Sequence, residues 1–154
     1  MKQIILFLIL ILSLASCSGG LENLGSISIK NVSSDTIILR ETTIELQEGD
    51  VVELWNDMSI ETKQKDKVHV FYGLEHYLEG KSRGGMKLDA LKTNPTILES
   101  KESARGRLVW SFQGKMAHID ILESGKYTFK AAVFTSDKEL ILNRASLIFK
   151  RRNK

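Results

Sequence analysis

The stretch Ser26-Ile27-Ser28-Ile29-Lys30 (SISIK) alternates between polar and apolar side chains. Successive side chains of an extended chain point to opposite faces, so this alternation predicts a β-strand with one face buried and one in water. Short strands separated by glycine, serine and aspartate clusters predict an all-β domain, an antiparallel sandwich or barrel. Further extended segments are expected at residues 36–46, 51–56, 68–78, 106–113, 116–122, 126–135 and 139–150.

Residues 94–102 (NPTILESKE) do not share this pattern. Asn94 before Pro95 is a suitable helix cap, because proline fits the first helical position. We therefore expect either a short helix or an irregular loop in this segment.

The stretch Glu123–Phe129 (ESGKYTF) joins two of the expected strands. It resembles the turn and tyrosine corner that lead into the F strand of immunoglobulin-like domains. The resemblance implies that the Tyr127 hydroxyl bonds back to the backbone at the corner and that Phe129 lies in the core. That family often has cysteine where Phe129 stands, and jelly-roll modules show similar endings. The expectation is a two-sheet antiparallel β-sandwich, with either immunoglobulin-like or jelly-roll strand order.

The chain begins with Met1-Lys2-Gln3 and the apolar run Ile4–Leu12, which is too short to cross a membrane and is typical of a secretory signal. Leu14-Ala15-Ser16-Cys17 resembles the lipobox of bacterial lipoproteins. The resemblance implies that the peptide bond before Cys17 is cleaved and that Cys17 is acylated. Residues 1–16 would then be a signal peptide.

Three regions follow from this interpretation. Residues 17–25, rich in glycine and serine, would be the lipidated cysteine and a flexible tether, and residues 26–154 would form the sandwich domain. Several acyl chains together hold a protein on a bilayer, so we expect anchoring to a membrane of the bacterial envelope. Ser18 after the cysteine weakly favours the outer membrane. The single cysteine excludes an internal disulfide.

No pattern of catalytic residues stands out. His69 and His76 have opposite parity on the segment 68–78 and would not share a metal ion. Gly80-Lys81-Ser82 lacks the first glycine of a phosphate-binding loop, and there is no GxSxG elbow. The sequence therefore predicts a protein that is not an enzyme and that has no metal or cofactor.

Binding is the more promising function, and parity suggests where. Trp55, near Asp57, and the pair Phe71 and Tyr77 have the parity of an exposed aromatic platform with hydrogen-bonding neighbours. Such platforms hold sugar rings or peptides. These four residues are the predicted ligand site. The alternative is that their rings line an ordinary core or its rim.

Charge adds one further candidate surface. The formal net charge of +3 includes Lys2, and positive residues gather at Lys150-Arg151-Arg152-Asn153-Lys154. This segment is suited to anionic lipid headgroups or an acidic partner, or is simply a solvated chain end. No aromatic-basic motif typical of nucleic-acid binding is present.

Two functions therefore remain open. In the first, the sandwich is an accessory module that pairs with another envelope protein through exposed strand edges, with residues 140–151 as the contact strand. In the second, it is a lipoprotein that binds a glycan or peptide on the aromatic platform.

Overall fold

The computed structural model describes residues 20–33, 36–63 and 68–152, and the regular structure in these ranges consists of strands only. None of the described segments is a helix of the length and apolarity needed to cross a membrane. The strands are β1 (Leu21–Ser28), β2 (Arg40–Leu46), β3 (Val51–Thr62), β4 (Val70–Leu78), β5 (Lys81–Asp89), β6 (Thr96–Ala104), β7 (Arg107–Asp120), β8 (Gly125–Thr135) and β9 (Ile141–Arg152).

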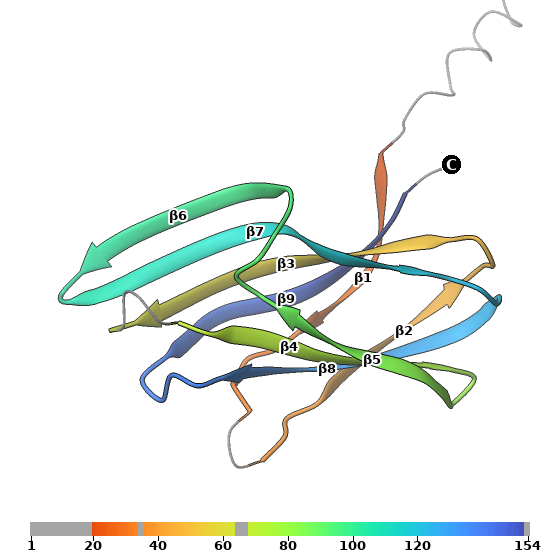
Figure 1. The fold of residues 1–154 in the computed structure, drawn as a ribbon, viewed down its shortest axis with the longest axis horizontal. Helices are drawn as coiled ribbons and strands as arrows, with labels where there is room; N and C mark the ends of the chain where they lie inside the picture. Colours follow the sequence, from red (N-terminus) through yellow and green to blue (C-terminus); the bar gives the residue numbers. More distant parts are fainter. Residues whose placement is uncertain (1–19, 34–35, 64–67, 153–154) are drawn as a thin grey trace, which may run out of the picture.

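The strands form two antiparallel sheets packed face to face, so the predicted β-sandwich is confirmed (Figure 1). Sheet A has the order β1-β9-β3-β7-β6, and sheet B has the order β2-β8-β4-β5. Between β4 and β5 the turn residues Glu79 and Gly80 both have positive φ angles, 47° and 80°. A tight hairpin turn of type I′ requires this geometry.

The pairing of the strands is nested. β4 pairs with β5, β3 with β7, β2 with β8 and β1 with β9, while β6 is added at the outer side of β7. A long antiparallel ribbon rolled up in this way is a jelly roll, one of the two orders that the sequence left open. The immunoglobulin-like order is not formed, because there the first two strands share a sheet, whereas β1 and β2 lie in opposite sheets.

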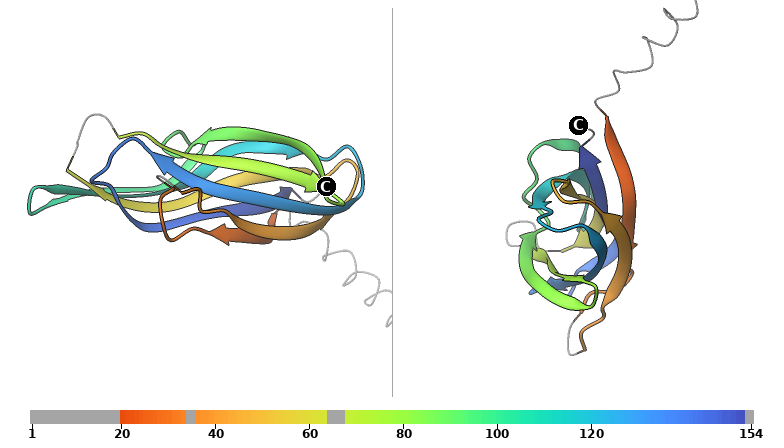
Figure 2. Two further views of the ribbon diagram at one scale, coloured as in Figure 1. Left: turned by 90° about the horizontal axis from the view of Figure 1, so that it is seen from below. Right: turned by 90° about the vertical axis from the view of Figure 1, so that its right-hand side faces the viewer.

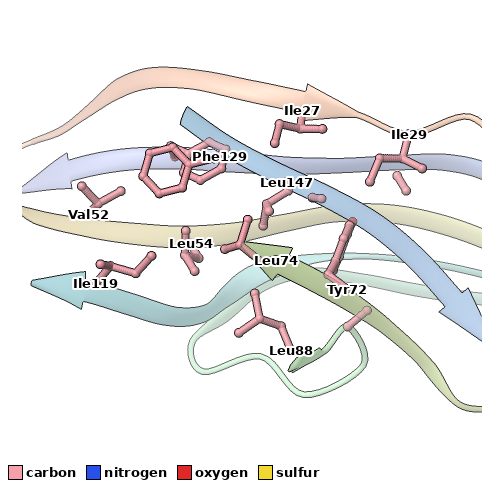
Figure 3. Packing of buried hydrophobic residues seen from close by; sticks show 14 of the residues in the cluster. Ile27, Ile29, Val52, Leu54, Tyr72, Leu74, Leu88, Ile119, Phe129 and Leu147 are labelled. Carbon is pink, nitrogen blue, oxygen red and sulfur yellow. The ribbon is translucent and has the colours of Figure 1, made fainter. Parts of the chain in front are cut away.

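One continuous hydrophobic core fills the space between the sheets (Figure 3). Alternate residues of the strands other than β6 point into it, for example Leu54 from β3, Leu74 from β4 and Phe129 from β8, all almost completely buried. The core also holds a satisfied polar pair, because the Tyr72 hydroxyl donates to Oδ1 of Asn56 at 2.8 Å and Nδ2 of Asn56 donates to a backbone carbonyl. Burial raises the pKa of the Tyr72 hydroxyl far above its ordinary value.

The corner between β7 and β8 has the local geometry that its sequence predicts. The Tyr127 hydroxyl donates to the carbonyl of Glu123 at 2.9 Å, and Phe129 is fully buried. This hydrogen bond spans four residues, so it reports the turn alone. A correct tyrosine corner is therefore compatible with a strand order that is not immunoglobulin-like.

We expect Tyr127→Phe to lower the free energy of unfolding by about 1 kcal/mol, because one partly buried hydrogen bond is lost and the ring remains. Urea denaturation of the purified protein measures the loss. Tyr77→Phe is the matched control, since its hydroxyl contacts an exposed carboxylate. Equal losses of unfolding free energy in the two variants would show that the hydrogen bond at the corner stabilises the fold no more than an exposed one does.

Three sequence predictions need correction. The expected tether is already part of β1 from Leu21 onward. The expected helix or loop at residues 94–102 is largely the strand β6. Two separate segments, 106–113 and 116–122, are covered mainly by the single strand β7, whose first half forms with β6 a hairpin that projects beyond the rest of the sandwich (Figure 2).

The final strand is not a sheet edge. β9 pairs on one side with β1 and on the other with β3, so the prediction of residues 140–151 as an open contact strand is wrong. The edges of sheet A are β1 and β6, and those of sheet B are β2 and β5.

Candidate binding site

The structure places Trp55 and Asp57 on the outer face of sheet A. Their neighbours Leu54, Asn56 and Met58 on β3 point into the core. Asp57 is ion-paired with Arg144 of the adjacent strand, with 2.9 Å between Oδ1 and Nη2. These two residues therefore belong to the side of the sandwich that faces away from sheet B.

Phe71 and Tyr77 lie on the outer face of sheet B, because Tyr72 and Leu74 on the same strand point into the core. The four predicted ligand residues are therefore split between opposite outer faces, and the structure does not bring them together. Parity shows which residues of a strand share a face, but it does not show to which sheet the strand belongs. Each face carries its own cluster of interactions.

On sheet A, a buried carboxylate organises the surroundings of Trp55. Glu53 is only 2% exposed. Its Oε1 accepts from Lys115 and from Arg152 at 2.8 Å each, and its Oε2 accepts from the Trp55 indole at 3.0 Å. The ammonium of Lys150 lies 4.2 Å from the ring centroid of Trp55. We name these five residues the Trp55 cluster.

The electrostatics of the cluster favour a charged Glu53. Burial alone would raise the pKa of this carboxyl, but the hydrogen bonds from Lys115, Trp55 and Arg152 outweigh burial and hold the pKa below the ordinary value of 4.5. The indole face is covered by Lys150, so Trp55 is only 6% exposed and offers little ring surface to a sugar.

On sheet B, the outer face is hollowed into an open groove of about 410 Å³ that crosses the strands. We name it the sheet-B groove. One end is formed by Ile37 and Leu39, which precede β2 and are 62% and 50% exposed. It is lined by Ile37, Leu39, Gly73, Leu74, Glu75, Gly85, Met86, Lys87, Lys130, Ala132 and Phe134.

Small residues make the groove possible. Gly73, Ala132 and Gly85 provide little or no side chain at its floor. A Cβ atom at Gly73 would lie only 3.1 Å from Cε2 of Phe134, so glycine allows this ring to lie down on the sheet. Phe134 in turn stacks on Phe71 with ring centroids 5.4 Å apart. The position of the Phe134 ring is thus fixed by its contacts with Gly73 and with Phe71.

Charged groups border this apolar surface. Lys87 lies 3.8 Å above the ring centroid of Phe71, and Lys130 is 3.5 Å from the carboxylate of Glu41. The Tyr77 hydroxyl donates to Glu75 at 2.6 Å, and this hydrogen bond raises the pKa of the phenol. Phe71 and Tyr77 therefore contact the groove through Phe134 and Glu75 and do not line it themselves.

Sequence reasoning missed the residues that form the groove. Ile37 and Leu39 belong to the expected extended segment 36–46, but alternation alone did not show that their side chains face water. Phe134 gave no separate signal because it follows the buried strand residues of β8. The unusual feature was a pair of small residues beside a pair of aromatic residues on neighbouring strands, since Gly73 lies opposite Ala132 and Phe71 lies opposite Phe134, and only the register reveals this.

These two outer faces carry apolar side chains together with hydrogen-bonded and ion-paired groups. Among the ranges that the structure describes, no three histidine, cysteine or acidic side chains come together as a metal site would need. Of the described residues that line the groove, one is a carboxylate, Glu75, and two are lysines, Lys87 and Lys130. The groove combines an apolar floor with a few charged groups, a combination also found in the contact surfaces of protein complexes.

No protein-family model matches this chain, and no curated protein matches its sequence significantly.

Proposed function

We propose that this protein is a membrane-anchored lipoprotein of the bacterial envelope, and that its non-catalytic sandwich binds another protein in the sheet-B groove. The observation that supports the proposal is the apolar lining of that groove. Ile37 and Leu39 at its end are 62% and 50% exposed. Large apolar side chains grouped on one concave surface are typical of a protein contact.

A protein segment fits this groove better than a glycan does. Sugars stack on a free aromatic face, but the Phe71 ring is stacked with Phe134 and has Lys87 over it. The partner segment expected here has apolar side chains to fill the space between Phe134 and Leu39. It also has charged groups to meet Glu75, Lys87 and Lys130, which fix its direction.

Substitution of the groove rim tests the proposal. We expect Ile37→Asp combined with Leu39→Asp to reduce capture of the partner about ten-fold or more, because a charge placed in an apolar contact is not compensated there. The measurement is crosslinking and affinity capture of the full-length, C-terminally tagged protein from its own cells, with quantitative mass spectrometry. Leu122→Asp is the control, since Leu122 is 79% exposed and lies outside the groove.

The outcome is informative in both directions. A stoichiometric envelope protein that is retained by the Leu122→Asp variant and lost from the double variant supports the groove as the contact surface. Retention of the same protein by both variants would contradict it and direct the search to the strand edges.

The anchor is tested separately, because Cys17 and the lipobox lie outside the described residues. Metabolic labelling with a palmitate analogue should mark the wild-type protein and not Cys17→Ser. Absence of label on the wild type would contradict the lipoprotein assignment while leaving the groove proposal intact.

A further inference from the structure

The register of the sheet brings two distant parts of the chain together. β1 pairs with β9 so that Leu21 lies opposite Arg152 and Asn23 opposite Lys150. Figures 1 and 2 show the beginning of β1 beside the C-terminal end of β9. Leu21 is the fourth residue after Cys17, and at most about 3.6 Å per residue these four steps span about 14 Å. An acylated Cys17 would therefore keep this corner of sheet A next to the bilayer.

The Trp55 cluster, which reaches this corner through Lys150 and Arg152, carries positive charge. The Trp55 cluster holds three cations, Lys115, Lys150 and Arg152, against the single carboxylate of Glu53, a formal net charge of 3 − 1 = +2. Arg152 keeps 67% of its side chain exposed although it is paired. Asp120, at the end of β7, is an exposed carboxylate at the border of the cluster.

We infer that the outer face of sheet A around Trp55 lies against anionic phospholipid headgroups of the membrane that holds the anchor. The inference rests on the acylation of Cys17 proposed above. Each basic residue near an anionic membrane surface favours the bound orientation about five-fold, and the interaction is screened by salt. Because Lys115 and Arg152 are fixed by Glu53, the positive groups are already arranged on one surface.

This orientation has a consequence for the proposed partner site. The sheet-B groove lies on the opposite outer face of the sandwich. With sheet A against the headgroups, the groove faces away from the membrane and is open to a protein in the aqueous compartment.

The two tryptophans make the orientation measurable. Trp55 lies in the basic cluster, and the other tryptophan, Trp110, lies on the projecting hairpin and contacts Lys101 and Glu99. Trp110→Phe therefore leaves Trp55 as the single tryptophan, whose emission can be excited selectively over that of the three tyrosines. The lipidated protein is reconstituted in vesicles of phosphatidylcholine, alone or mixed with anionic phosphatidylglycerol, that contain a lipid with a nitroxide on its headgroup.

We expect quenching of Trp55 to be about two-fold or more stronger in the anionic vesicles, and to fall to the neutral level in high salt. Lys150→Glu with Arg152→Glu should abolish the difference. Lys150→Gln with Arg152→Gln is the milder variant should the first not fold. Lys63→Glu with Lys92→Glu, the same charge change at two exposed lysines outside the cluster, should leave the difference unchanged.

Each contrary result has its own meaning. Absence of acylation at Cys17 would overturn both the anchor and this orientation. Acylated protein with equal quenching in neutral and anionic vesicles would overturn the orientation alone. Equal quenching together with loss of a captured acidic protein from the Lys150 and Arg152 variants would assign the basic face to that protein and overturn the lipid contact.

Discussion

Phe129→Ala is expected to lower the free energy of unfolding by about 3–5 kcal/mol, the usual cost of removing a large buried ring and leaving a cavity. Phe129 is fully buried, and its ring centroid lies 4.6 Å from that of Phe149 in the other sheet and 6.2 Å from that of Tyr127. The ring therefore connects the two sheets. Urea denaturation followed by circular dichroism measures the loss.

Phe134→Ala is the matched control for this prediction. Phe134 lies on the same strand but on the outer face, half-buried against Phe71 and above Gly73. Its loss should cost at most about half as much, because water can fill the space that the ring leaves. Similar losses for the two variants would contradict the assignment of Phe129 to the central core.

Glu53→Gln is the second substitution with a large expected effect, about 3 kcal/mol at neutral pH. It leaves Lys115, only 20% exposed, without its charged partner, and the loss of one member of a buried ion pair is strongly destabilising. The lower end of the usual range is expected, since Arg152 can turn into water.

The same variant should change the response to acid. The pKa of Glu53 is lowered in the folded protein, so its contribution to stability is present above the ordinary pKa of 4.5 and is lost as the pH falls through the folded pKa. Wild type and Glu53→Gln should therefore converge in stability as the pH drops below 4.5. A constant difference down to the acid transition would contradict the charge-based explanation.

The chain contains an exposed version of the same arrangement, which provides the control. Glu99 accepts from the Trp110 indole at 3.0 Å and pairs with Lys101 at 2.9 Å, and Lys101 lies over the Trp110 ring. Because its side chain is 45% exposed, Glu99→Gln is expected to have a much smaller effect than Glu53→Gln. Comparison of Glu53→Gln with Glu99→Gln separates the effect of burying the carboxylate from the effect of its tryptophan and lysine partners.

Alternation along the chain was sufficient to predict the fold class and several strand faces. It failed where a local irregularity breaks the period of two. β1 has a register shift between Asn23 and Gly25, which explains why Leu21–Gly25 resembled a tether. β6 is a sheet edge whose side chains are mostly exposed, so no apolar alternation marks it.

Gly114 shows why one strand was predicted as two. A glycine between two extended segments usually indicates a turn. Here a Cβ atom would lie 2.6 Å from the carbonyl oxygen of Pro95 and from the side chain of Thr93, so glycine admits the backbone that leads into β6. The reason for the glycine is a contact from a distant segment, which the local sequence does not contain.

The candidate site was harder to predict than the fold. The residues Trp55, Asp57, Phe71 and Tyr77 have the outward parity that the sequence suggested, but β3 and β4 belong to different sheets. Sheet membership depends on pairing between strands far apart in the chain. The groove depends further on register, since it needs Gly73 opposite Ala132 and Gly85 opposite Glu75.

The nested pairing of the strands also bears on how the chain reaches its native state. The β4–β5 and β6–β7 hairpins each join strands that are neighbours in sequence across a two-residue turn, so they are the natural places for folding to start. Each pair added outward closes a longer loop, and the contact between Glu22 and Arg151 spans 129 residues. Loop closure of this length slows folding. We expect β1 to dock last, because its neighbour in sheet A is β9, the strand farthest from it along the described chain.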